Sequence, residues 1–165
     1  MDEDRKAIAD YSKSIESNPE DASSYLDRGV AYLDLEECEK GITDLDKAIE
    51  LDTEYALAYF NRGMAYSDLG EYEKAEVDLT RSIELDPEYS YSYLIRGPVY
   101  AELGEYEKGI ADLDKAIELD PDNASAHVKR GLVHAALEEY GKGIADLNKA
   151  IELDPDNASA HVKRG

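Results

Sequence analysis

Apolar side chains in the middle of the chain recur at the spacing of an α-helix. Within Ala56–Leu69, the residues Tyr59, Gly63 and Tyr66 follow one another at steps of four and three, so they share one helical face. Tyr72–Leu85 carries a second stripe of the same kind. The pattern predicts two amphipathic helices joined by a short connection. The second stripe consists of Ala75, Leu79, Ser82 and Ile83.

Both predicted helices are followed by stop signals. Gly70 comes after the first helix and Asp86-Pro87 after the second, and glycine and proline commonly end helices. Each helix spans about 21 Å at 1.5 Å per residue. Gly63 has no Cβ, so another helix can approach it closely. Neither stripe can be buried by one helix alone, so stability must come from neighbouring elements.

The dipeptide Arg-Gly recurs every 34 residues, beginning at Arg28, Arg62, Arg96, Arg130 and Arg164. A fixed period of this length is typical of a chain built from stacked copies of one helix pair, which has no single core. The sequence predicts one array over residues 1–165 with ten helical segments, the last one short. The copies are 1–21 (second helix only), 22–55, 56–89, 90–123, 124–157 and 158–165 (start of a first helix).

The repeat resembles the tetratricopeptide repeat, whose signature is an aromatic residue, Leu-Gly, a tyrosine, an alanine, an aromatic residue and a closing proline. The chain departs from it with Arg62 where the family favours leucine, and with Cys38 and Thr53 where tyrosine and proline are expected. The resemblance implies an all-α, right-handed superhelical solenoid of antiparallel helix pairs. The matching residues of the second copy are Tyr59, Gly63, Tyr66, Tyr72, Ala75, Leu79, Ser82 and Pro87.

The resemblance also implies that the first helix of each copy lines a concave groove. Apolar residues opposite the packing stripe would make this groove a binding surface for a protein or peptide. Inter-repeat packing is the alternative explanation for the same residues. The candidates are Leu26, Val30 and Leu33 in the first full copy, Leu57, Phe60, Asn61 and Met64 in the second, Tyr91, Leu94, Ile95 and Pro98 in the third, and Val128, Lys129 and Leu132 in the fourth.

Acidic residues lie along the edge of the predicted groove, so we expect a ligand with apolar and basic residues. Some members of the family hold the acidic C-terminus of a chaperone with lysine and asparagine side chains. This chain has apolar residues at the corresponding positions, and only Asn61 matches, so we reject that specificity. The edge residues are Asp27, Asp34, Asp68 and Glu102.

The net charge of −21 disfavours binding to nucleic acid or to an anionic membrane surface. No run of 18 apolar residues is present, and the acidic start is unlike a signal peptide. The single cysteine cannot form an internal disulfide, which suits a reducing compartment and predicts a cytoplasmic location.

No arrangement in the sequence favours catalysis, and we expect no enzyme activity, metal or cofactor. Cys38 occupies a packing position, and His127, His134 and His161 replace tyrosines of other copies. His127 and His134 lie about 10 Å apart along a helix, too far to share one metal ion. Residues 120–123 resemble a calcium loop but lack its glycine and its distal glutamate.

Our preferred interpretation is a non-catalytic interaction scaffold, and the alternative is a self-assembly module whose incomplete end copies meet between chains. Residues 105–131 and 139–165 differ at only two positions. Such similarity favours a recent tandem duplication or a designed array, and the chain is either a whole array or a fragment. The differing pairs are Glu107 with Gly141 and Asp114 with Asn148.

The repeat arginine and Pro98, both within the predicted first helices, lead to two further predictions. Each repeat arginine follows an aspartate of the preceding copy by 18 residues, as Arg62 follows Asp44 and Arg28 follows Asp10. We therefore predict partly buried Arg–Asp pairs between neighbouring copies. Pro98 lies inside the third of these helices, lacks an N–H and should distort that helix.

Overall fold

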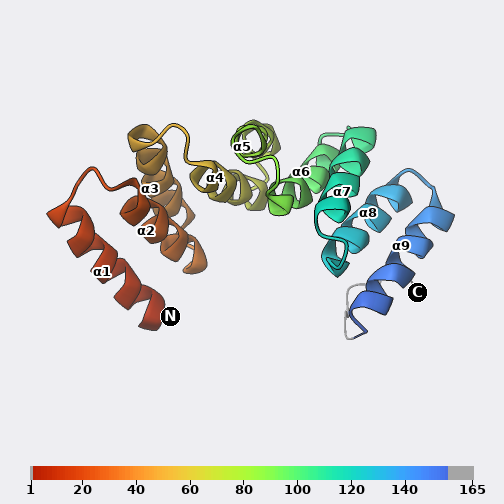
Figure 1. The fold of residues 1–165 in the computed structure, drawn as a ribbon, viewed down its shortest axis with the longest axis horizontal. Helices are drawn as coiled ribbons and strands as arrows, with labels where there is room; N and C mark the ends of the chain where they lie inside the picture. The colour runs from red at the N-terminus through yellow and green to blue at the C-terminus, as the bar shows by residue number, and fades with distance from the viewer. Residues whose placement is uncertain (1, 156–165) are drawn as a thin grey trace. The chain divides into compact units, whose positions relative to one another are not determined.

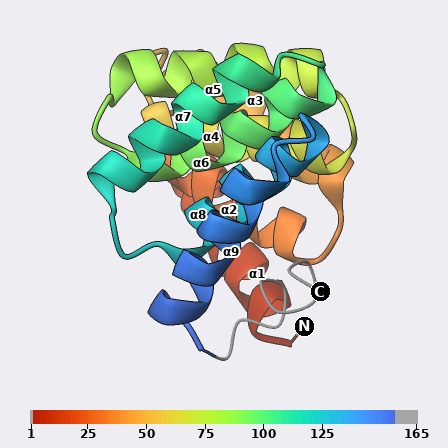
Figure 2. The same cartoon turned by 90° about the vertical axis from the view of Figure 1, so that its right-hand side faces the viewer.

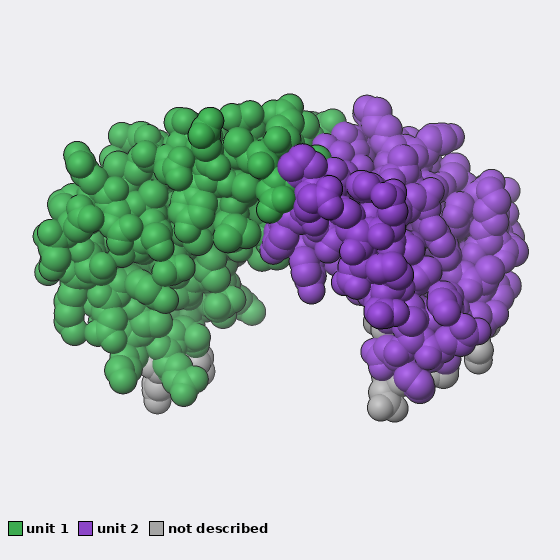
Figure 3. Space-filling model, in the orientation of Figure 1, with its two compact units in different colours: residues 1–86 green, residues 87–165 purple. Residues whose placement is uncertain are grey.

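The computed structural model describes residues 2–155, and these residues form nine α-helices in two compact units (Figures 1 and 3). Residues 1–86 make up unit 1 and residues 87–165 make up unit 2. Unit 1 contains α1 (Asp2–Ser17), α2 (Ala22–Asp34), α3 (Cys38–Leu51), α4 (Ala56–Asp68) and α5 (Tyr72–Leu85). Unit 2 contains α6 (Ser90–Glu102), α7 (Tyr106–Leu119), α8 (Ala124–Ala136) and α9 (Tyr140–Leu153).

Each full copy forms one antiparallel pair of helices, as predicted (Figure 2). The first helix of a pair has 13 residues and the second has 14, as in α4 and α5. The predicted tenth segment, 158–165, lies outside the described residues. End-to-end association through this segment, and a single array over the whole chain, therefore stay predictions.

The turn within each pair has a left-handed backbone at the same repeat position. Gly70 has φ 74°, and the N–H of the next residue, Glu71, donates to the carbonyl of Tyr66 at 2.8 Å. This bond closes the end of the helix. The stop predicted at Gly70 is thus confirmed. The equivalent residues are Gly104, Glu36 and Glu138, all with positive φ.

The two helices of a pair touch at the repeat glycine. A Cβ built on Gly97 would lie 2.6 Å from Cγ of Leu113 and 3.1 Å from the carbonyl oxygen of Gly109. The side chain of Leu113 is fully buried. The glycine is therefore required by close helix contact, as the sequence suggested, and any larger residue must push the pair apart.

Apolar clusters join each copy to the next within a unit. In unit 1 one cluster contains Leu45 and Ala48 of α3 together with Ala58 of α4. In unit 2 a matching cluster contains Leu113 of α7 and Ala126 of α8. Within unit 1, α3 is thus covered by α4, and within unit 2, α7 is covered by α8, which stacks these copies.

The repeat arginine pairs with an aspartate of its own copy. Nε and Nη2 of Arg62 each donate to the carboxylate of Asp78 at 2.7 Å, and the Asp78 side chain is only 4% exposed. The predicted pairing with the preceding copy's Asp44 is wrong. A short turn places the middle of α4 opposite the middle of α5, so the partner lies 16 residues later. The other pairs are Arg28–Asp44, Arg96–Asp112 and Arg130–Asp146.

Some of these arginines also contact the preceding copy, through a different residue. Nη1 of Arg62 donates to Asp46 of α3 at 2.6 Å, and Nη1 of Arg130 donates to Asp114 of α7 at 2.5 Å. The hydrogen bond to Asp78 raises the pKa of Arg62 above its usual value, and the hydrogen bond to Asp46 adds to this shift. The guanidinium therefore holds its own helix pair and links it to the preceding copy.

Asp78 and Asp46 bind the same guanidinium but differ in burial, which predicts unequal effects on stability. Asp78→Asn should lower the free energy of unfolding by about 3–5 kcal/mol, because it removes the buried carboxylate and leaves the partly buried arginine with only the exposed Asp46. Asp46 is 54% exposed, so Asp46→Asn should cost at most about 1 kcal/mol. Urea denaturation of both variants checks this, and equal losses would contradict it.

The glycine contact predicts opposite results at two glycines of unit 2. Gly97→Ala should destabilise the protein by about 1–3 kcal/mol through overpacking against Leu113. Gly141 lies in α9, where a Cβ would meet nothing within 4 Å. Gly141→Ala should therefore be neutral or stabilise by up to about 1 kcal/mol, because alanine favours helix. Thermal melts followed by circular dichroism should show a lower melting temperature for Gly97→Ala and an unchanged or higher one for Gly141→Ala.

Candidate functional site

One face of every first helix remains open to solvent within its unit. Repeat positions are counted from the first residue of each copy, so Ala56 is position 1 of the second full copy. The open face contains positions 2, 6, 9 and 13, which share a helical face. In all four full copies the outer two residues of this open stripe are exposed and the middle two are half-buried. The open stripes are Ser23, Asp27, Val30 and Asp34 of α2; Leu57, Asn61, Met64 and Asp68 of α4; Tyr91, Ile95, Pro98 and Glu102 of α6; and Ser125, Lys129, Leu132 and Ala136 of α8.

Repeat position 5 does not belong to the open stripe. The expectation that its residues form exposed apolar surface is wrong, because each is at most 8% exposed. Leu94, for example, packs in one cluster with Leu113 of α7 and Ala126 of α8. Inter-repeat packing, the alternative explanation, therefore accounts for this position. Its residues are Leu26, Phe60, Leu94 and Val128.

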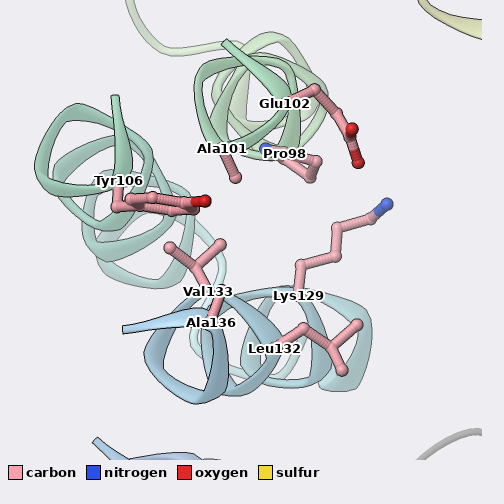
Figure 4. A pocket seen from close by; sticks show the side chains of 8 residues that line it. All are labelled: Pro98, Ala101, Glu102, Tyr106, Lys129, Leu132, Val133 and Ala136. Atoms are coloured by element: carbon pink, nitrogen blue, oxygen red, sulfur yellow. The ribbon is translucent and has the colours of Figure 1, made fainter. Parts of the chain in front are cut away.

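The open stripes of α6 and α8 border a pocket of about 320 Å³ in unit 2 (Figure 4). Pro98, Lys129 and Leu132, three of the predicted site residues, line it together. Tyr106 reaches the pocket from α7 and its ring lies near Val133 (Figure 4). The lining residues are Pro98, Ala101, Glu102, Tyr106, Lys129, Leu132, Val133 and Ala136.

A small residue at repeat position 12 leaves room for this pocket. In the first full copy this position is Leu33, whose Cδ2 would lie only 2.7 Å from a Cβ added to Gly41. In unit 2 the equivalent residue is Ala101, whose side chain is a single methyl group. No leucine atom is among the nearest neighbours of the corresponding Gly109. Ala101 lines the pocket, whereas the equivalent Leu33 packs against Gly41.

Other predicted residues lie outside the pocket but on open stripes. In unit 1, Asn61 Nδ2 donates to the carbonyl of Leu57 at 2.7 Å, so this amide is turned back onto its own helix. Val30 and Met64 are half-buried. In unit 2, Tyr91 is exposed beside Tyr89, with ring centroids 5.6 Å apart, and Ile95 is half-buried.

Charged groups stand at the edges of the open stripes. Glu102 on α6 and Lys129 on α8 extend on either side of the pocket opening (Figure 4). In unit 1, burial raises the pKa of Asp27, and repulsion from Asp21 adds to the shift. Both effects disfavour the ionised carboxylate of Asp27. A nearby positive charge would stabilise the ionised carboxylate and lower its pKa again.

The histidines of the last full copy replace tyrosines in the packing stripe. His127 and His134 are both buried, with Nδ1 of His127 3.3 Å from Asp146 and Nδ1 of His134 2.7 Å from Glu139. Burial raises the pKa of Asp146, but the bonds from Arg130 and His127 outweigh it, so the pKa lies below its usual value. These side chains hold the helix pair together.

Among residues 2–155, no group of three or more histidine, cysteine or acidic residues is placed to hold a metal ion. Over the same part of the chain, every helix is too short or too polar to cross a membrane. Cys38 is a half-buried free thiol.

Pro98 does not shorten its helix. α6 runs without interruption to Glu102, the repeat position at which α2, α4 and α8 also end. The ring of Pro98 lines the pocket instead (Figure 4). The proline therefore shapes the wall of the pocket, although it still removes one backbone donor from the helix.

Antiparallel helix pairs that stack copy on copy define the class of α-helical repeat proteins. Family models of the TPR repeat match residues 31–70 and 97–138, and models of the tetratricopeptide repeat match 56–89 and 124–157. The chain belongs to the tetratricopeptide repeat family. Such proteins are generally non-catalytic scaffolds for protein–protein interaction. No curated protein sequence matches the chain.

Solved structures share the fold. A crystal structure of MamA has 29% identity and a TM-score of 0.82, over 92% of this chain and 88% of MamA. TTC0263, a thermophilic TPR protein in Thermus thermophilus, has 22% identity and a TM-score of 0.79, over 95% and 86%. The first TPR of Spaghetti (RPAP3), bound to the HSP90 peptide SRMEEVD, has 25% identity and a TM-score of 0.64, over 68% and 90%.

The position of Pro98 predicts a stabilising substitution. Pro98→Ala restores an N–H that can donate to the carbonyl of Leu94, and removing an interior proline is worth up to about 3 kcal/mol. The melting temperature should rise. Pro121→Ala, in the exposed loop before α8, is the matched control and should leave the melting temperature unchanged or lower it. A rise for Pro121→Ala alone would contradict the explanation.

Proposed function

We propose that the chain is a non-catalytic scaffold that binds a peptide segment along the open stripes of its first helices. The observation that carries this proposal is the pocket between α6, α7 and α8, which opens on one of these stripes. Pro98, Leu132 and Val133 give it apolar walls and Tyr106 adds an aromatic ring. Such a site suits one apolar or aromatic side chain, whose burial contributes about 1.5–3 kcal/mol.

Charge supports a ligand that also carries basic residues. Every first helix except α8 ends its open stripe on an acidic residue: Asp34, Asp68 or Glu102. Asp27 lies on the open stripe of α2, and its raised pKa indicates a carboxylate that a cation would stabilise. The net charge of −21 attracts basic segments from a distance.

The Spaghetti (RPAP3) structure supports peptide binding by this fold, because its printed ligand is a peptide. Its acidic sequence, SRMEEVD, is a poor model for the ligand of this chain. Repeat position 5, where a chaperone-binding clamp carries lysine, is buried and apolar here. The proposed ligand therefore has a different chemistry from that peptide.

Blocking the pocket tests the proposal. Ala136 is an exposed alanine on its rim, so Ala136→Phe should occlude the opening while changing stability by no more than about 0.5 kcal/mol. A peptide selected from a display library against the unmodified protein is titrated calorimetrically. We expect the variant to bind it at least about tenfold more weakly, a loss of about 1.4 kcal/mol.

Ala111→Phe provides the matched control for this titration. Ala111 is exposed on α7 and is not among the residues that line the pocket. This variant should bind the peptide as the unmodified protein does. Equal affinity of all three proteins would show that the pocket is not the binding site.

A further inference from the structure

The pocket of unit 2 carries opposite charges on opposite walls. Glu102 is the last residue of α6, and Lys129 lies near the start of α8. Figure 4 shows both side chains extending from the two helices on either side of the opening, with Pro98 and Leu132 beside them. An occupant of the pocket therefore meets one negative and one positive group at the opening.

Among the open stripes of the four full copies, no other position carries a basic residue. The position equivalent to Lys129 in the second copy is Asn61, whose amide donates to its own helix. The position equivalent to Glu102 in the first copy is Asp34, which is exposed. The corresponding part of unit 1 thus has an acid and no cation. The mixed charge of the unit 2 opening is a property of this site rather than of the repeat.

We propose that this pocket selects a segment in which an apolar or aromatic side chain is flanked by one basic and one acidic residue. The inference rests on the proposed peptide-binding function and specifies the partner. The apolar side chain enters between Pro98, Tyr106 and Leu132. The basic neighbour then lies toward Glu102 and the acidic neighbour toward Lys129.

The arrangement also fixes the direction of the bound segment. Reversing the segment brings like charges together at both walls, and like charges at short range are repulsive. The apolar walls exclude water from one side of each pair, which strengthens both attraction and repulsion. Lys129 and Glu102 are therefore specificity-determining residues, and the apolar walls supply most of the affinity.

Charge-reversal variants test this selection with acetylated and amidated peptides that share one central phenylalanine. Its two neighbours are Lys and Glu in either order, two lysines, or two glutamates. The unmodified protein should bind one of the two mixed peptides at least about fivefold more tightly than any other peptide. Lys129→Glu should prefer the peptide with two lysines, and Glu102→Lys the peptide with two glutamates.

The double variant Glu102→Lys/Lys129→Glu gives the sharpest result. It restores one charge of each sign with their places exchanged, so it should prefer the mixed peptide of the opposite order. Lys149→Glu and Glu118→Lys change the net charge by the same amounts as the single variants, at exposed positions away from the pocket. These controls should keep the preference of the unmodified protein.

The outcomes separate the inference from the function on which it rests. In one outcome the peptides bind, Ala136→Phe weakens their affinity, and the order of affinities is the same in all charge variants. This outcome would overturn the selection and leave the binding function standing. A failure of every peptide to bind the unmodified protein, or binding that Ala136→Phe does not affect, would overturn both. Calorimetric titration at a fixed salt concentration supplies all of these affinities.

Discussion

The close contact between the two helices of each copy is the constraint on which the other features depend. It is made at a glycine, because the space that a Cβ of Gly97 would need is already occupied by Leu113. With the pair held at this distance, the arginine beside the glycine lies opposite an aspartate of the second helix. Within each unit the next first helix then packs over the second helix, as α4 does over α3 and α8 over α7.

Electrostatic contacts follow the same repeat and explain the abundance of tyrosine. In the first three full copies, the tyrosine three residues before each repeat arginine lies under the guanidinium of that arginine. Cζ of Arg62, for example, lies 5.8 Å from the centroid of the Tyr59 ring. A second tyrosine faces a lysine of the second helix, as Tyr66 lies 5.0 Å from Lys74. The last full copy replaces both rings with histidine. The signature tyrosines therefore pack against apolar neighbours and also contact cations.

The helix pairs were predictable because their signals are local. Periodicity and the stop at Gly70 gave nearly the observed bounds of α4 and α5. Glu36 shows the limit of such signals, since it takes a left-handed conformation that its sequence does not suggest. There the N–H of Glu37 donates to the carbonyl of Tyr32 at 2.9 Å, the same helix-ending bond that follows Gly70. The arginine pairing was wrong because sequence spacing alone does not say which neighbouring helix lies opposite.

The candidate site was only partly predictable, since it depends on contacts between helices. Helical periodicity identifies the faces of a helix but not how many neighbours cover it, so Phe60 and Leu94 were wrongly placed on open surface. Pro98, Lys129 and Leu132 do meet at one pocket. Ala101 of α6 and Tyr106 of α7 also line it, and this meeting of three helices does not follow from the pattern of one repeat.

The pairing of cations within each copy has a consequence for the kinetics of association. In every full copy the repeat arginine and a lysine at the start of the second helix contact carboxylates of the same copy, as in Arg62–Asp78 and Lys74–Glu71. The surrounding field is therefore set by the excess of 39 acidic over 18 basic residues. Such a field accelerates the encounter with cationic partners and is screened by salt. Ionic strength should thus govern how fast the proposed peptide ligand arrives, and the apolar pocket should govern how long it stays.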